Sequence, residues 1–148
     1  MTDDCFNILL ADDDADDRMF FQDVLDELLI NASLTVVSNG MELMAFLEKN
    51  LQELPNVLFL DLNMPSKSGA ECLEEIKKHE KLSHIPVVIY STSANPEVIE
   101  QLYNMGAQYY VRKEGDFSLL KTVINKALTL CREGDRSQPQ RNNFLILL

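Results

Sequence analysis

Acidic residues follow two apolar runs of strand length in this sequence. Three aspartates, residues 12–14, come directly after residues 6–11 (FNILLA), and Asp61 comes directly after residues 57–60 (VLFL). Clustered carboxylates resist joint ionisation, and a hard divalent cation relieves their repulsion. Oxygen ligands of this kind suit Mg²⁺. The residue types therefore predict a magnesium site, provided that the fold brings the two segments together.

Two more apolar runs end in polar groups. Residues 86–90 (PVVIY) precede the hydroxyls of residues 91–93 (STS), and residues 109–111 (YYV) precede Arg112 and Lys113. A hydroxyl and a cation beside carboxylates and a metal suit phosphoryl transfer, in which positioning and charge neutralisation carry most of the catalysis. Each signal is weak alone, because a strand-end serine often only caps a turn and a strand-end lysine is usually solvated. Their shared position at strand ends is more specific.

The acidic residues at the start of the following segment have a simpler explanation. Asp14, Asp16 and Asp17 lie where a helix begins, and acidic side chains there cap the helix and complement its dipole. We therefore expect these three to be structural, and we expect Asp12 and Asp13, at the strand end itself, to belong to the site.

Strand-like and helix-like patterns alternate along most of the chain. Expected strands cover residues 6–11, 34–38, 57–60, 86–90 and 109–111, and expected helices cover residues 15–30, 41–50, 70–78, 96–105 and 117–131. This alternation predicts an α/β fold with a parallel sheet covered on both faces. Right-handed crossovers favour a doubly wound, five-stranded, flavodoxin-like sheet of order 2-1-3-4-5. Ligands of such sheets bind at the carboxyl ends of strands 1 and 3, where both acidic segments fall.

Composition narrows the classes of partner and the compartment. The chain has 148 residues, 46% hydrophobic and 25% charged, with a net charge of −11. Since nucleic-acid and anionic-membrane binding rely on basic surfaces, we expect neither partner. The N-terminus is acidic rather than signal-like, no apolar run approaches about 20 residues, and three widely spaced cysteines suit a reducing compartment. These features predict a cytoplasmic protein.

The last residues differ in composition from the rest of the chain. We expect a domain over residues 1–132 and a tail over residues 133–148, in which a polar linker (EGDRSQPQRNN) precedes the apolar segment FLILL. That segment is too apolar to stay free in water without consequence. Three alternatives are open for it: folding back on its own domain, pairing across a homodimer, or docking on the cognate partner.

The sequence resembles the receiver domains of two-component response regulators, which are CheY-like. The matching segments are ILLADDD, VLFLDLNMPSKSG, IPVVIYSTSA and GAQYYVRK, which span roughly residues 5–132. The block LDLNMPxxxG is the most specific of them. The resemblance implies a stand-alone receiver that takes a phosphoryl group from a histidine kinase or phosphotransfer protein in a Mg²⁺-dependent phosphorelay. It would assist only its own phosphorylation and dephosphorylation, without being an enzyme. Because only 16 residues follow Arg132, we expect it to signal to an unknown downstream protein by contact.

The resemblance also implies roles for individual residues. Asp61 would be the phosphoacceptor, and Asp12, Asp13, Asp61 and the backbone carbonyl of Asn63 would hold Mg²⁺. Ser91 and Lys113 would bind phosphoryl oxygens. On phosphorylation Ser91 would shift and Tyr110 would turn inward as the switch. Asn63 and Ser93 would tune the lifetime of the aspartyl phosphate.

One position departs from the family pattern. Receivers usually have Lys-Pro with a cis bond after the fifth strand, whereas this chain has Lys113-Glu114-Gly115. A non-proline cis bond costs roughly 2.5–4 kcal/mol. We therefore predict a trans Lys113–Glu114 bond, with Gly115 absorbing the turn.

Two other functional classes remain as rivals. The first is a binding module with the same fold that signals without phosphorylation, which would bind Mg²⁺ but take up no phosphoryl group. The second is a metal-dependent phosphohydrolase, which would need a second acid two residues after its nucleophile. Asn63 holds that position and cannot exchange protons in this way.

Overall fold

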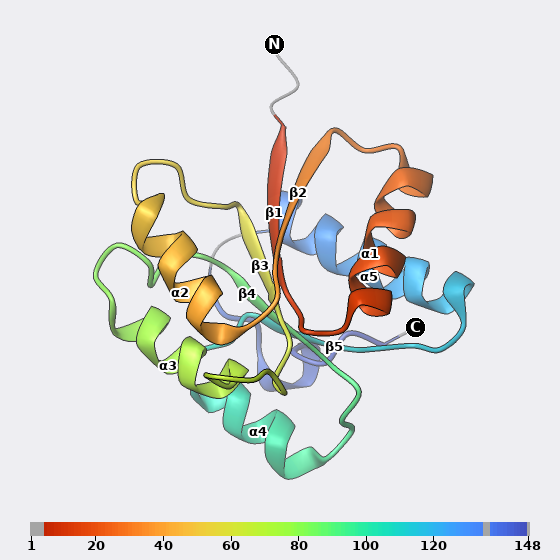
Figure 1. Ribbon diagram of the computed structural model, residues 1–148. Helices are drawn as coiled ribbons and strands as arrows, with labels where there is room; N and C mark the ends of the chain where they lie inside the picture. The colour runs from red at the N-terminus through yellow and green to blue at the C-terminus, as the bar shows by residue number, and fades with distance from the viewer. Residues whose placement is uncertain (1–4, 135–136, 148) are drawn as a thin grey trace.

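One parallel sheet forms the centre of the protein. The structure is a computed structural model that describes residues 5–134 and 137–147. Its strands follow the order β2-β1-β3-β4-β5, so the predicted doubly wound α/β fold is confirmed (Figure 1). The strands are β1 (Phe6–Ala11), β2 (Ala32–Val37), β3 (Val57–Leu60), β4 (Val87–Ser91) and β5 (Tyr109–Arg112). Residues 1–4 of the predicted domain and residues 135, 136 and 148 of the predicted tail lie outside the described residues.

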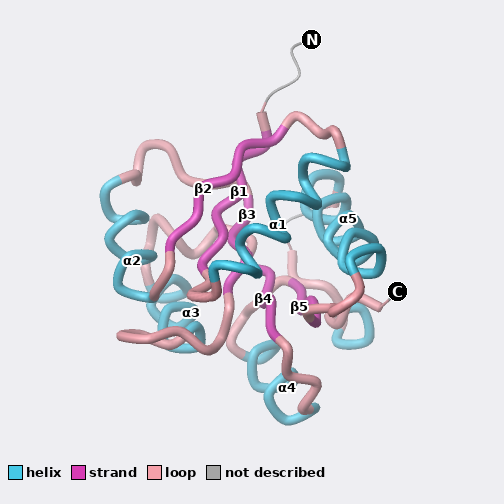
Figure 2. Tube along the Cα trace, turned by 45° about the vertical axis from the view of Figure 1, so that its right-hand side comes forward, coloured by secondary structure: helices cyan, strands magenta, loops and turns pink. Residues whose placement is uncertain are grey.

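Helices cover both faces of this sheet (Figure 2). They are α1 (Ala15–Leu28), α2 (Gly40–Lys49), α3 (Gly69–Lys78), α4 (Pro96–Asn104) and α5 (Phe117–Glu133). Helices α1 and α5 bury one core against the sheet, and α2, α3 and α4 bury the other. Every residue of β3 and β4 is buried, which explains why these strands read as continuous apolar runs.

Local signals set most helix ends. Ser68 and Glu71 form a reciprocal capping box at the start of α3, and the Asn95 side chain caps α4. Gly106, just past α4, has a φ of 98°, which favours glycine. Helix α1 ends at Leu28, two residues earlier than predicted, because Leu29 takes a left-handed conformation (φ 54°).

The tail lies on its own domain. The backbone N–H of Ile146 donates to the carbonyl of Tyr110 (3.0 Å), and the N–H of Tyr110 donates to the carbonyl of Phe144 (3.0 Å). Leu145 thus forms a parallel bridge with Tyr110, along the edge of β5. The Phe144 ring is fully buried against Tyr103 of α4. A short 3₁₀ turn, η1 (Arg141–Asn143), leads into this segment within the predicted linker.

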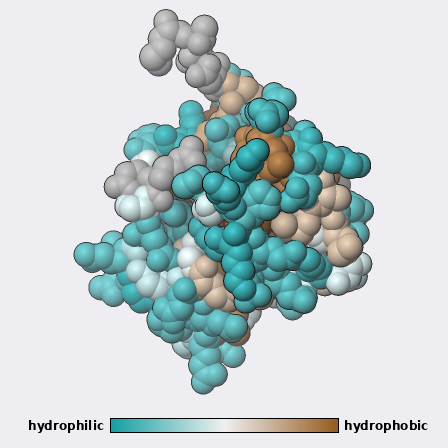
Figure 3. Space-filling view, turned by 90° about the vertical axis from the view of Figure 1, so that its left-hand side faces the viewer, coloured by the Kyte–Doolittle hydropathy of each residue, from teal (hydrophilic) through white to brown (hydrophobic). Residues whose placement is uncertain are grey.

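Polar side chains dominate much of the surface. The face that carries α2 and α3 is largely hydrophilic in the space-filling view (Figure 3). Among the helices that the structure describes, none has the length and apolarity needed to cross a membrane.

Candidate functional site

The sheet register brings the acidic segments together. The N–H of Asp61, directly after β3, donates to the carbonyl of Ala11 at the end of β1 (2.9 Å). Asp12, the next residue after β1, donates in turn to the carbonyl of Val37 on β2 (3.1 Å). Asp12 and Asp61 therefore leave neighbouring strands side by side, at the point where strand order reverses.

Three carboxylates form a cluster at this point. One oxygen each from Asp12, Asp13 and Asp61 lies within 4.8 Å of the others. Asp12 is fully buried and Asp61 is 5% exposed, whereas Asp13 faces solvent. Burial raises the pKa of Asp61 to about 7, and the nearby charges of Asp12 and Asp13 act in the same direction. Burial also raises the pKa of Asp12.

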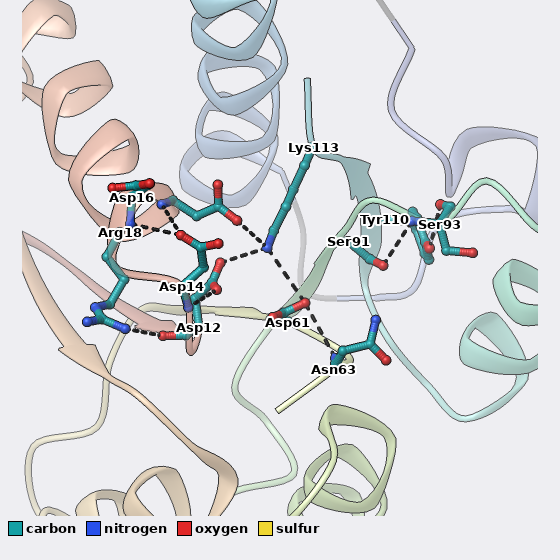
Figure 4. A network of polar contacts seen from close by, with 11 residues as sticks. Asp12, Asp14, Asp16, Arg18, Asp61, Asn63, Ser91, Ser93, Tyr110 and Lys113 are labelled. Carbon is teal, nitrogen blue, oxygen red and sulfur yellow. Dashed lines mark hydrogen bonds and ion pairs between the residues drawn. The ribbon is translucent and has the colours of Figure 1, made fainter. Parts of the chain in front are cut away.

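Lys113 is the cation of the site (Figure 4). Its Nζ lies 2.9 Å from Asp12 Oδ2, 2.9 Å from Asp17 Oδ2 and 3.7 Å from Asp61 Oδ1. It also lies 5.2 Å from the centre of the Tyr90 ring. Burial alone would lower the pKa of Lys113, but its close contacts with the carboxylates of Asp17 and Asp12 outweigh burial and raise the pKa above its ordinary value.

The two oxygens of Asp12 have different partners. Oδ1 accepts the N–H of Asp14 (3.0 Å). Oδ2 is buried and meets Lys113 as an ion pair, but no donor in the described part of the chain gives it a well-directed hydrogen bond. A buried carboxylate oxygen with spare capacity suits an additional polar or cationic ligand.

Helix α1 is tied to the same site. As predicted, Asp14 is its N-cap: Asp14 Oδ1 accepts the N–H groups of Asp16 (2.8 Å) and Asp17 (3.1 Å). The Asp17 side chain also bonds Lys113, a contact that the sequence did not predict. In addition, Arg18 Nη1 donates to the carbonyl of Asp12 (2.8 Å).

The segment after Asp61 is constrained by Gly69. The N–H of Gly69 donates to the carbonyl of Leu62 (2.9 Å), and a Cβ at Gly69 would lie 2.1 Å from the carbonyl oxygen of Asp61. Any side chain there would displace the acidic residue. Asn63 lies within this segment; its N–H points at Asp61 Oδ1 over a long 3.5 Å, and its side chain is exposed.

Ser91 lies at the end of β4 without touching the acidic cluster. Its hydroxyl is buried and accepts the N–H of Ser93 (3.2 Å), and its carbonyl accepts the N–H of Lys113 (2.8 Å). Among the described residues, the Ser91 hydroxyl has no hydrogen bond to Asp61. The structure thus brings Asp12, Asp13, Asp61 and Lys113 into one cluster and places Ser91 at its border.

Tyr110 is buried in this structure. Its hydroxyl donates to the carbonyl of Ser93 (2.9 Å), and its ring lies 6.2 Å from the ring of Phe144. The tail therefore packs against the side chain that we predict to be the switch.

The Lys113–Glu114 bond is trans, as predicted. The chain bends at Gly115, as expected, but it does so without a conformation that needs glycine. Gly115 does not take a positive φ, and a Cβ there would meet nothing within 4 Å. The turn therefore does not require glycine at this position.

Sequence reasoning missed three residues that contact the site: Asp17 and Tyr90 at Lys113, and Arg18 at the carbonyl of Asp12. Asp17 could have been found, because it lies in the first turn of the helix after β1 and that turn overhangs the carboxyl edge of the sheet. No sequence signal links Tyr90 to Lys113.

Comparisons with known proteins agree with this geometry. The family model of the response regulator receiver domain matches residues 8–125. Response regulator Rcp1 from Synechocystis sp. is 36% identical over 121 residues, which are 79% of this chain and 82% of Rcp1. The solved structure of the phosphorylated cyanobacterial phytochrome response regulator RcpA has 30% identity and a TM-score of 0.80, over 88% of this chain and 96% of that chain. The Mn²⁺-bound form of Rcp1 has 31% identity and a TM-score of 0.77, over 90% of this chain and 98% of that chain. The chain therefore belongs to the family of response regulator receiver domains.

Proposed function

We propose that this receiver takes a phosphoryl group onto Asp61 from a histidine kinase or a phosphotransfer protein. The observation that carries the proposal is the position of Asp61, a nearly buried carboxylate at the end of β3 that shares a crevice with Asp12, Asp13 and the ammonium of Lys113. Phosphoryl acceptance in signalling is the role of the family.

The donor set fits a divalent cation, and we propose Mg²⁺. The clustered oxygens of Asp12, Asp13 and Asp61 are hard ligands, and the buried Asp12 Oδ2 retains unused acceptor capacity. The Asn63 carbonyl would complete the protein's share of the ligands. Rcp1, a relative, has been solved with Mn²⁺, an ion of similar ligand preference. When bound, the ion would offset carboxylate repulsion and the negative charge of the phosphoryl oxygens.

The chemistry at Asp61 is a phosphoryl exchange between two nucleophiles. A carboxylate oxygen of Asp61 forms a bond to phosphorus while the bond from phosphorus to the donor's imidazole nitrogen breaks, and the imidazole recovers a proton. Lys113 would pair with one phosphoryl oxygen, and the Ser91 hydroxyl would donate to another. Asn63, which is exposed, and Ser93, which is half-buried, would tune hydrolysis of the aspartyl phosphate. The domain would thus promote only its own phosphorylation and dephosphorylation.

The output would be a protein contact. We propose that Ser91 and Tyr110 pass the state of Asp61 to the surface of α4, β5 and α5, where an unknown downstream protein binds. In this proposal residues 1–132 form the receiver and residues 133–148 a tail that modulates this surface. We further propose that the chain forms a homodimer through the same surface. We also propose that it meets its partners in the cytoplasm. We propose no role for nucleic acid or membrane.

Intact mass after incubation with acetyl phosphate tests the acceptor. The wild-type chain with Mg²⁺ should gain one phosphoryl group, and chelation of the metal should suppress the gain. Asp61→Asn should abolish labelling, whereas Asp23→Asn, which removes an exposed carboxylate of α1, should not. Labelling retained in Asp61→Asn would refute the assignment of Asp61. No labelling of the wild-type chain under any condition would favour the phosphorylation-independent binding module.

A further inference from the structure

Lys113 is not centred on the proposed phosphoacceptor. Its Nζ contacts Asp12 and Asp17 at 2.9 Å each, whereas Asp61 is 3.7 Å away. The Lys113 side chain is 10% exposed, so its charge is mostly removed from water and its position depends on its protein partners. Asp17 draws the ammonium toward α1, Asp12 draws it toward the end of β1, and Asp61 draws it toward the end of β3.

We propose that Asp17 is a positioning residue that holds Lys113 back from Asp61 until a phosphoryl group arrives. Phosphoryl binding then requires the ammonium to give up part of its contact with Asp17. The side chain of Asp17 thus sets how readily the site accepts a phosphoryl group. This inference rests on the proposed function, because it assumes that Asp61 is the acceptor and that Lys113 pairs with the phosphoryl oxygens.

Hydrogen bonds hold the backbone of Asp17 in place at the start of α1. Its N–H is capped by the carboxylate of Asp14 (3.1 Å) in the first turn of α1. The next residue, Arg18, donates to the carbonyl of Asp12 (2.8 Å), which ties the same turn to the end of β1. A carboxylate on a turn held at two points makes a stable anchor for a lysine that comes from β5.

Asp17 is also the partner that the chemistry does not otherwise need. Asp12 belongs to the proposed metal ligands, and Asp61 accepts the phosphoryl group. Asp17 has no contact with Asp12 or Asp61 among the described hydrogen bonds and ion pairs, and its side chain is 31% exposed. Its contact with Lys113 therefore stabilises the unphosphorylated arrangement without contributing to the phosphorylated one, which is the condition for a residue that shifts the balance between two states.

The effect should be modest in size. A partly exposed ion pair is worth about as much as a two- to fivefold change in an equilibrium constant. Removing the Asp17 charge should therefore tighten binding of beryllofluoride, a phosphoryl mimic, by about two- to fivefold. It should speed labelling by acetyl phosphate in the same direction, because Lys113 is then free to meet the incoming anion.

The chain offers a matched control for this test. Asp16 is the preceding residue in the same helical turn, is exposed, and makes no side-chain hydrogen bond or ion pair within the described residues. Asp16→Asn removes the same charge at almost the same place without touching Lys113. Asp17→Glu is the conservative variant, which keeps the charge within reach of the lysine.

The experiment is a titration of the full-length chain with beryllofluoride at saturating Mg²⁺, alongside urea unfolding of each variant. We expect Asp17→Asn to bind the mimic more tightly, and Asp16→Asn and Asp17→Glu to match the wild type. An unchanged affinity in Asp17→Asn, even with a change in stability, would show a merely structural ion pair and overturn the proposal. An equal gain in Asp16→Asn would overturn it as well, by showing a general charge effect.

Different results would refute the proposed function and the role of Asp17. If the wild-type chain neither binds beryllofluoride nor gains a phosphoryl group, the proposed function fails. If the wild type does both and Asp17→Asn behaves like the wild type, only the inference about Asp17 fails.

Discussion

Asp61 lies in an environment that disfavours its charge. Burial and the neighbouring carboxylates raise its pKa to about 7, and the ammonium of Lys113 only partly opposes them. The donors nearest to Asp61 Oδ1 are the N–H of Asn63 (3.5 Å) and Nζ of Lys113 (3.7 Å), so no short hydrogen bond occupies this oxygen. The carboxylate can therefore bind a metal ion or attack a phosphorus atom. The same condition makes the metal-free site a source of instability near neutral pH.

This instability should depend on pH in a defined direction. The pKa of Asp61 is about 7 in the folded chain against an ordinary value of 3.8, so the folded chain binds more protons than the unfolded chain between these values. Stability must then fall as pH rises through that window. Asp61→Asn, which resembles the protonated acid, should raise the free energy of unfolding by about 1–4 kcal/mol above pH 7, and by almost nothing near pH 4.

Urea unfolding in the presence of a metal chelator, at several pH values, measures this difference. Asp23→Asn serves as control, because solvent screens that exposed charge on α1 and no pH-dependent gain is expected. A gain in Asp61→Asn that is equally large at low pH would mean that the ionisation of Asp61 is not its cause.

At the scale of the elements, the tail changes what β5 presents to its surroundings. An edge strand leaves backbone groups unpaired and invites association. Here the N–H and carbonyl of Tyr110 bond to residues 144 and 146, and the ring of Phe144 fills the space between Tyr103 and Tyr110. The residues that precede this segment make further contacts; for example, the hydroxyl of Tyr103 donates to the carbonyl of Pro139 (2.8 Å).

Truncation of the buried ring should therefore loosen the tail. Phe144→Ala removes a fully buried side chain, and such changes typically cost about 3–5 kcal/mol when the whole domain depends on them. We expect the tail to detach without unfolding the domain, and therefore expect a smaller global loss, about 1–3 kcal/mol, together with rapid amide exchange at Ile146. Leu147→Ala, at a 68% exposed position, should change stability by less than about 0.5 kcal/mol.

Hydrogen exchange followed by NMR, with urea unfolding, distinguishes the outcomes. Protection of the Ile146 amide in the wild type and its loss in Phe144→Ala would support the docked tail. An unprotected Ile146 amide in the wild type would contradict the arrangement in which it donates to Tyr110.

The sequence was sufficient wherever the relevant signal is local. Residues close together in the sequence determine several of these structures, including the apolar strand β3, the Ser68 capping box and the turn at Gly106. The order of the elements and the carboxyl ends of the strands could therefore be predicted from the sequence. The convergence of Asp12 and Asp61 followed from that order alone, because parallel strands share one carboxyl edge.

The parts that could not be predicted depend on side-chain geometry between distant residues. Asp17 and Lys113 are separated by 96 positions, and only the direction of the first turn of α1 decides that they meet. Phe144 docks between Tyr103 of α4 and Tyr110 of β5, and the spacing of apolar residues in the sequence does not indicate this contact. The packing of Phe144 against the Tyr110 ring follows from that docking, and the sequence alone did not indicate it.

At the scale of the whole molecule, Tyr110 lies between the site and the tail. Its hydroxyl bonds the carbonyl of Ser93, two residues beyond Ser91, and its ring and backbone contact the tail at Phe144. If a phosphoryl group stabilises the buried position of Tyr110, it must also stabilise the docked tail. By thermodynamic linkage the tail then strengthens phosphoryl binding by the same factor.

This linkage gives a prediction with two independent readouts. Phe144→Ala should weaken binding of beryllofluoride, by about fivefold if the coupling lies at the lower end of the usual range. In the wild type, beryllofluoride should slow exchange of the Ile146 amide by a similar factor, whereas Leu147→Ala should leave its affinity unchanged. A shift in one readout without the other would violate reciprocity and exclude Tyr110 as the link.

The change in affinity predicted for Phe144→Ala is opposite in direction to that predicted for Asp17→Asn. Since these two residues share no partner, the double variant should show the sum of the two free-energy changes. A strongly non-additive double variant would mean instead that the lysine and the tail report on a single switch.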